Sequence, residues 1–205
     1  MIFHRLRQGA IGCVLADLHP NTIGRPTTVT SNPEPENNLS ESPESDTSES
    51  RVVSFLDSTG VPYEIVEIDP DFADTAAFCE KYGFPMENSA NTIIVASKKK
   101  PKTFIAAVVR ATHRIDVNHT VKRVMNVGKI SFARAEETVE LTGMMIGGVT
   151  VLALPPGLPI YVDPGLVGLD YVILGGGSRS IKIKVSPDIF SVIPGALVVE
   201  GLTGG

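Results

Sequence analysis

Short runs of β-branched and aliphatic residues, each bounded by polar residues, glycine or proline, recur along residues 51–205. The clearest run is Thr92–Ala96, where Ile93, Ile94 and Val95 are continuous, as is typical of a buried strand. Further runs predict strands at 63–68, 103–109, 130–133, 151–154, 160–162, 171–174 and 181–185. Helical patterns are fewer and fall at 51–59, 74–83, 116–125, 134–142 and from 186 onward. The sequence therefore predicts an α/β fold, a mixed and mostly antiparallel curled sheet with flanking helices.

The first 50 residues differ in composition from the rest of the chain. Between Ser31 and Ser50 the only apolar side chain besides prolines is Leu39. Such a segment buries too little apolar surface to offset its ordering entropy, so we expect residues 1–50 to be a disordered acidic extension and residues 51–205 the folded domain. The opening MIFHRLRQGAIGCVLADL is either a targeting segment or an extension, and Asp17 favours the extension.

Charge and reactive side chains exclude several classes of function. The net charge is −5, yet the segment from Lys98 to Arg134 holds ten Lys and Arg residues and one acid, Asp116. The chain has two cysteines and four histidines, which argues against a disulfide framework and a histidine-based metal site or triad. No run approaches transmembrane length. We expect a cytoplasmic protein that uses no metal or cofactor and binds no membrane.

Two glycine-rich segments, GMMIGGVTV (143–151) and GGGSRSIKI (175–183), are the strongest candidates for a site. Glycine lets a ligand approach the backbone, and successive free N–H groups form an anion-binding concavity for a phosphate, carboxylate or oxyanion. Neither segment is a Walker motif or GxGxxG. Tight turns of a sheet explain the glycines equally well. Ser178 and Arg179, at the tip of the second segment, favour a ligand role.

At these residues the chain resembles the YbaK/prolyl-tRNA synthetase-associated family of aminoacyl-tRNA deacylases. The resemblance extends over about 52–199 and is carried by ordered segments: GVPYEIVEI, DTAAFCEKYGFP, SANTIIV, ATHRIDVNHTVKRV, AEETVELTGMMIGGVT, LPIYVD and GGGSRSIKIKVSP. It implies a pocket for the aminoacylated 3′ end of tRNA, hydrolysis of the ester in trans, and association with tRNA and with an aminoacyl-tRNA synthetase. An activated ester needs placement, a stabilised oxyanion and water, which fits a chain poor in histidine.

The resemblance also implies the catalytic residues. The backbone of Gly147, Gly148, Val149 and Thr150 matches the family's GxxxP substrate loop, with Val151 in place of the proline. Asn91 stands where the family carries a lysine, so a neutral amide replaces an ammonium. Lys182 is the candidate that restores a cation if its side chain points inward. Its alternation with Ile181 and Ile183 favours an exposed lysine instead.

Further residues are expected at the pocket or on the tRNA path. The resemblance implies substrate contacts from Gly175, Gly176, Gly177, Ser178, Arg179, Asp163 and Tyr63. Asp163 either braces the loop of Arg179 or initiates a turn before Pro164, and Thr75 is explained as a helix N-cap. The expected contacts with tRNA phosphates are Lys98, Lys99, Lys100, Lys102, Arg114, Lys122 and Arg123. A solvated basic surface explains these residues equally well.

Three functional hypotheses follow from the sequence. The first is a deacylase in which Asn91 orients the carbonyl or the ribose. The second is a binding protein that keeps the pocket but has lost catalysis with the lysine. The third is an interaction domain with no RNA ligand, which predicts no salt-dependent binding of tRNA.

Overall fold

The computed structural model describes residues 47–204, which form ten strands and nine short helical segments. The strands are β1 Tyr63–Glu67, β2 Ala90–Ser97, β3 Phe104–Arg110, β4 Arg114–Ile115, β5 Ile130–Phe132, β6 Ile160–Val162, β7 Val172–Gly175, β8 Ile181–Val185, β9 Ala196–Val198 and β10 Thr203–Gly204. The helices are α1 Ser48–Thr59, α2 Thr75–Tyr82, α3 Lys122–Met125, α4 Ala135–Thr142, α5 Pro164–Val167 and α6 Ile189–Val192. Short 3-10 helices, η1 Pro70–Phe72 and η2 Met86–Asn88, and a π-helical turn, η3 Val117–Val121, complete the elements.

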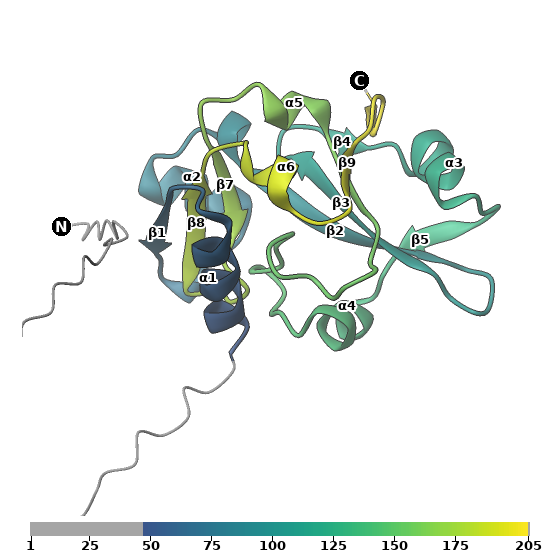
Figure 1. The fold of residues 1–205 in the computed structure, drawn as a ribbon, viewed down its shortest axis with the longest axis horizontal. Helices are drawn as coiled ribbons and strands as arrows, with labels where there is room; N and C mark the ends of the chain where they lie inside the picture. Colours follow the sequence, from purple (N-terminus) through teal and green to yellow (C-terminus); the bar gives the residue numbers. More distant parts are fainter. Residues whose placement is uncertain (1–46, 205) are drawn as a thin grey trace, which may run out of the picture. The chain divides into compact units, whose positions relative to one another are not determined.

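The strands form three sheets with helices packed around them (Figure 1). The five-stranded sheet has the order β5-β2-β3-β6-β9, antiparallel from β5 to β3 and parallel from β3 to β9. The three-stranded sheet, β1-β8-β7, is antiparallel, and β10 pairs with β4 in a small third sheet. The predicted mixed α/β fold is confirmed, and the strands divide among three sheets.

The main core lies between the two larger sheets and beneath α1. Val52 and Leu56 of α1 are fully buried and belong to one hydrophobic cluster with side chains of β2, β3, β6, β7 and β8. The helix begins at Ser48, three residues before the predicted start. The Thr47 side chain accepts the Ser50 N–H at 3.2 Å, and the Ser48 hydroxyl donates to the Gly177 carbonyl at 2.9 Å. A cap and a distant contact therefore extend the helix into the polar segment.

One predicted strand is wrong. Residues 151–154 form irregular structure and turns, although Val151 and Leu152 are buried in the core. Ala153 has a φ of 56°, and Pro155 and Pro156 follow it. Proline has no N–H for a ladder, so the segment buries its side chains without pairing.

The remaining differences concern short elements. The last helix begins at Ile189 rather than at the predicted Pro187, and Asp188 is its N-cap. The four-residue helix α5 and the short strands β4, β9 and β10 were not predicted. The strands have two or three residues each, and their pairing partners are distant in sequence. Of the extension predicted to be disordered, 1–50, residues 1–46 lie outside the described part of the chain, and residues 48–50 form the first turn of α1 instead. No helix within 47–204 has the length and apolar character needed to cross a membrane.

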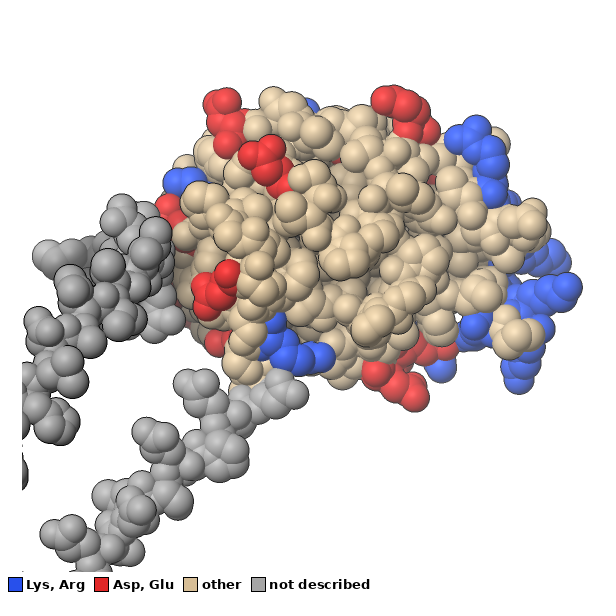
Figure 2. All heavy atoms as spheres, in the orientation of Figure 1, with Lys and Arg blue, Asp and Glu red and all other residues tan. Residues whose placement is uncertain are grey.

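Basic side chains gather at one end of the domain. The turn between β2 and β3 exposes Lys98, Lys99 and Lys100, and α3 and β5 lie at the same end (Figures 1 and 2). The space-filling view shows Lys and Arg grouped there, with most of the remaining surface on that face uncharged.

Candidate active site

A cavity of about 330 Å³ opens beside β2. Its wall is drawn from β2, β7, β8, α2, the loop after α4 and the end of β5. The residues that matter for the argument below are Asn91, Thr75, Phe132, Gly147, Val149 and Lys182. Polar and apolar groups therefore share one hollow, as in sites that bind small molecules.

The cavity lies where the outer edge of β2 has no strand beside it. β5 pairs with β2 only along Val95–Ser97, and β7 bridges to the chain at Ser89, the residue before β2, through Ile173. The Ile94 carbonyl accepts a hydrogen bond from Ala133 on the β5 side, so by the alternation of antiparallel pairing the backbone of Thr92 faces the same side. An uncovered strand edge thus forms part of the cavity wall.

The two glycine-rich loops converge, as the sequence predicted. The Gly177 N–H donates to the Gly148 carbonyl at 2.8 Å, and the Met145 N–H donates to the Gly177 carbonyl at 3.0 Å. A Cβ on Gly148 would overlap the Ser178 carbonyl, and one on Gly175 would lie 2.5 Å from the Gly148 oxygen. Glycine is required at both positions because two backbones cross there in contact.

The same contacts decide which backbone donors remain available. The Gly148 N–H donates to Met145 within its own turn, and the Gly177 N–H is committed to Gly148. The N–H groups of Gly147 and Val149 have no hydrogen-bond partner within residues 47–204, and both residues line the cavity. These two N–H groups are unpaired donors on cavity-lining residues, of the kind that bind an anion or a carbonyl oxygen.

Lys182 points into the protein and lines the cavity. Only 6% of the residue is exposed, and its Nζ donates to the Ala73 carbonyl at 2.6 Å and to the Gly147 carbonyl at 2.9 Å. The expected exposed orientation is therefore wrong and the inward alternative is confirmed. β8 lies between β1 and β7, and Lys182 is opposite Gly175 in the β7–β8 pair.

Burial and neighbouring charges set the electrostatics of Lys182. Burial lowers the pKa of its ammonium to about 8, while the Asp74 carboxylate raises the pKa and the Arg179 guanidinium lowers it. An ammonium has three N–H donors, and two are given to backbone carbonyls. The charged form therefore keeps a third donor, which the neutral amine lacks.

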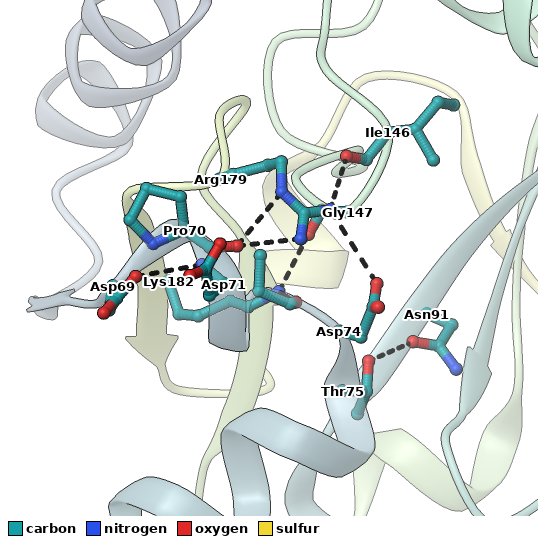
Figure 3. A network of polar contacts seen from close by, with 11 residues as sticks. Asp69, Pro70, Asp71, Asp74, Thr75, Asn91, Ile146, Gly147, Arg179 and Lys182 are labelled. Atoms are coloured by element: carbon teal, nitrogen blue, oxygen red, sulfur yellow. Dashed lines mark hydrogen bonds and ion pairs between the residues drawn. The ribbon is translucent and has the colours of Figure 1, made fainter.

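Arg179 forms a second bridge between the same two segments (Figure 3). Its Nε and Nη2 donate to the Pro70 carbonyl at 3.1 and 2.7 Å, and Nη1 donates to the Ile146 carbonyl at 3.3 Å. Nη1 also lies 3.9 Å from the Asp74 carboxylate. Arg179 and Lys182 thus join the segment 70–73 to the loop 146–147 at two points. Arg179 shapes the cavity without lining it.

Asn91 is held in a defined orientation by Thr75. The Thr75 hydroxyl donates to Asn91 Oδ1 at 2.7 Å, which leaves the Asn91 amide nitrogen without a partner among the described residues (Figure 3). The sequence offered Asp74 or Thr75 as the N-cap of α2, and Asp74 holds that position, so Thr75 has another role. The pair presents an N–H donor at the cavity wall. Asn91 lies within β2, which begins one residue before it.

Several predicted site residues do not line the cavity. The Ser178 hydroxyl donates to Glu49 of α1, and Gly177 contacts Ser48, so this loop faces α1 on its far side. Asp163 accepts hydrogen bonds from the N–H groups of Gly165 and Arg110 and lies 3.0 Å from His113 Nδ1. It caps α5 before Pro164, and within residues 47–204 no hydrogen bond or ion pair joins it to Arg179, so the turn interpretation holds. The cavity wall also omits Gly148, Thr150, Gly176 and Tyr63.

The predicted tRNA-contacting residues divide into two groups. Lys98, Lys99, Lys100 and Lys102 are exposed on the β2–β3 turn, with Lys122 and Arg123 on α3 at the same end. Arg114 lies instead on β4, in the separate two-stranded sheet. Lys102 forms an ion pair with Glu137, and this contact is the main cause that lowers the pKa of Glu137 to about 2.

A sequence model of the aminoacyl-tRNA editing domain matches residues 69–191, which include every residue that lines the cavity. The chain belongs to the aminoacyl-tRNA editing domain family. Solved structures agree with this assignment. A candidate trans-editing enzyme for prolyl-tRNA synthetase is 25% identical with a TM-score of 0.65, and the match covers 77% of this chain and 98% of that one.

Two more structures have the same fold as this editing domain. The hypothetical protein APE2540 is 27% identical, with a TM-score of 0.65 and coverage of 72% of this chain and 96% of that one. A scaffold protein used for grafting linear epitopes is 21% identical, with a TM-score of 0.65 and coverage of 77% and 98%. This last match shows the fold alone.

Sequence reasoning missed three contributors to the editing-domain cavity. They are the carbonyl of Ala73, the hydroxyl of Thr75 and the side chain of Phe132. No sequence pattern marks a backbone carbonyl as a lysine acceptor. Thr75 stands within the TAAF segment of the resemblance, and that position was the one available signal.

Proposed function

We propose that this editing domain hydrolyses the ester that joins a wrongly attached amino acid to the 3′ end of a tRNA. The observation that carries the proposal is the position of Lys182. Its buried ammonium lines the cavity beside the loop of Gly147. Lys182 belongs to the three-stranded sheet and Asn91 to the five-stranded sheet, so the two side chains reach the cavity from different sheets. A cation with a spare donor, placed among free backbone N–H groups, suits an oxygen that gains negative charge.

In this proposal water attacks the acyl carbonyl carbon, and the carbonyl oxygen becomes an oxyanion. The N–H groups of Gly147 and Val149 and the third N–H of Lys182 donate to that oxyanion. The intermediate collapses with cleavage of the bond to the ribose oxygen, which takes up a proton as the free amino acid leaves. The Asn91 amide, fixed by Thr75, donates to the ribose or the ester and orients it.

In this proposal Lys182 supplies the cation that the family's lysine would supply from the position of Asn91. By the resemblance, the ammonium would project from the position of Asn91, and here a neutral amide takes that place. Lys182 reaches the same cavity from β8. We infer that the charge has moved to another strand while the loop of Gly147 and Val149 remains in place.

A catalytically inactive binding protein is the alternative. It is favoured by the two hydrogen bonds from Lys182 to backbone carbonyls, which give this lysine a structural task whether or not it acts on a substrate. In that case the cavity holds the aminoacyl end of a tRNA without turnover.

The test is a deacylation assay across tRNAs charged with different amino acids, using wild-type protein and Asn91→Ala. Hydrolysis of at least one charged tRNA above the buffer rate, reduced by Asn91→Ala, is the expected result. Saturable tRNA binding with no turnover of any member of the panel would replace the deacylase with the binding protein. An absence of salt-dependent tRNA binding would remove both.

A further inference from the structure

Phe132 is exposed at the mouth of the cavity. At 55% exposure it is the only aromatic residue among the strongly exposed large hydrophobic side chains of residues 47–204, and it also lines the cavity. Ile146, from the loop that carries Gly147, is 46% exposed and lines the same cavity. The mouth thus has an aromatic and an aliphatic side chain open to solvent. Large apolar groups held at the rim of a site usually contact a ligand.

The strand register places Phe132 in line with the reacting end of the cavity. Phe132 is directly opposite Val95 in the β2–β5 pair, and opposite residues point to the same face. Asn91 lies four residues before Val95, so it shares that face at about 13 Å along the strand. Asn91 and Phe132 both line the cavity, so the two ends of this stretch of β2 belong to one site.

Exposed lysines lie beyond Phe132, at the end of the β2–β5 pair away from the cavity. The Lys98 N–H donates to the Lys129 carbonyl at 2.9 Å, so both lysines lie at the end of the β2–β5 pair away from the cavity. Lys98 and Lys129 are exposed, as are Lys99 and Lys100 on the adjoining turn. The order is therefore cations, exposed aromatic ring, cavity. The terminal ribose of a charged strand carries the 5′ phosphate, the base and the acyl ester as three separate substituents. The cations, the ring and the cavity offer one place to each of them.

We propose that Phe132 is the stacking platform for the unpaired base at the acylated 3′ end of the nucleic acid. The proposal rests on the proposed function for the identity of the strand. Aromatic rings stack on any nucleobase, and the interaction is sequence-tolerant. Phe132 does not reach the reacting atoms in this arrangement, so it is a positioning residue that acts through the base and ribose.

A direct binding test uses tryptophan fluorescence, because the chain has no tryptophan. Phe132→Trp places a single reporter at the rim, and Leu197→Trp, 59% exposed on β9, is the matched control. The probes are two single-stranded oligonucleotides that differ only in whether the 3′-terminal ribose carries adenine or no base. The expected result is saturable quenching of Phe132→Trp by the adenine probe, at least fivefold weaker with the abasic probe, and no response from Leu197→Trp. Equal responses to both probes, or none, would overturn the platform.

A kinetic test separates positioning from general damage. Phe132→Ala is expected to raise KM for the charged tRNA on the order of 5- to 100-fold, with kcat changed by less than about threefold. Phe132→Tyr keeps a stacking ring and is expected to restore KM. An unchanged KM in Phe132→Ala would overturn the platform and assign the rim to another partner, such as a protein. A kcat loss that Phe132→Tyr does not restore would also overturn it.

The two proposals fail in distinguishable ways. Base-dependent quenching of Phe132→Trp, with no hydrolysis by the wild-type protein, would remove the deacylase and keep the platform. Hydrolysis by the wild-type protein that is insensitive to Phe132→Ala would keep the deacylase and remove the platform.

Discussion

Lys182 Nζ donates a hydrogen bond to the carbonyl oxygen of Gly147 at 2.9 Å. This contact joins the strand after one glycine-rich loop to the tip of the other. It fixes the carbonyl of Gly147 and so helps to orient the neighbouring N–H groups of Gly147 and Val149. The ammonium keeps one N–H donor for a ligand. The relationship makes Lys182 both a support of the cavity and its buried cation, and the predictions below test these roles separately.

Hydrolysis is expected to fall as pH rises through about 8. Burial holds the pKa of Lys182 at about 8, and the ammonium is the protonated form, so the charge and the third N–H are present below that pH and lost above it. The measurement is kcat/KM for a charged tRNA from pH 6.5 to 9.5, corrected for spontaneous hydrolysis. A rise in corrected kcat/KM above pH 8 would assign the active form to the neutral amine instead.

Thr75→Val is expected to lower kcat about tenfold. The substitution keeps the shape of the side chain but removes the donor that fixes Asn91 Oδ1, so the Asn91 amide is free to rotate away from the substrate. Thr75→Ser is the matched control because it retains the hydroxyl, and we expect it to keep most of the activity. Equal activity of Thr75→Val and the wild-type protein would show that the orientation of Asn91 has no part in turnover.

Gly148→Ala is expected to destabilise the domain by about 2 kcal/mol or more. The new Cβ would overlap the backbone of Ser178, so one of the two loops has to move. Gly128→Ala is the control, since no atom lies within 4 Å of a Cβ at that position and its φ is not in the left-handed region. The measurement is the free energy of unfolding in urea. Similar values for both variants would contradict the close crossing of the loops.

Binding of tRNA is expected to depend less on salt when the β2–β3 turn loses its charge. Replacing Lys98, Lys99 and Lys100 with glutamine removes three exposed cations, so the slope of log K against log salt should fall by about 2. Arg114→Gln removes a cation from β4, in a different sheet, and we expect the slope to change by less than half a unit. A larger effect from Arg114 would place the tRNA on another face.

The sequence was most informative where local pattern decides the structure. The β-branched run of β2 and the glycine that ends α2 were recognised because strand and helix-end signals are local. The run 151–154 has the same composition as a strand, yet the prolines after it remove donors and it packs as an unpaired segment. β10 pairs with β4, which precedes it by more than half of the described residues, so no local window of sequence contains both strands.

In the candidate site, too, local signals were predicted and long-range arrangements were not. The convergence of the glycine-rich loops followed from their composition and the family resemblance. The direction of the Lys182 side chain could not be predicted in this way. Its alternation with Ile181 and Ile183 indicates an exposed lysine only in a sheet that has one face open to solvent. β8 is a central strand with the cavity on one side, and both of its faces are covered. Ser178 and Gly177 were assigned to substrate, but α1 begins three residues early and covers them.

Single-turnover hydrolysis by Lys182→Met tests the central claim most directly. Methionine keeps the length of the buried stem and removes the charge and the donors. Lys184→Met, on the same strand and paired with Glu64 outside the cavity, is the control. The account predicts a loss on the order of 10²- to 10³-fold for Lys182→Met, with the fold intact by circular dichroism and Lys184→Met near the wild-type rate. A folded Lys182→Met protein that hydrolyses the charged tRNA as fast as the wild type would contradict it.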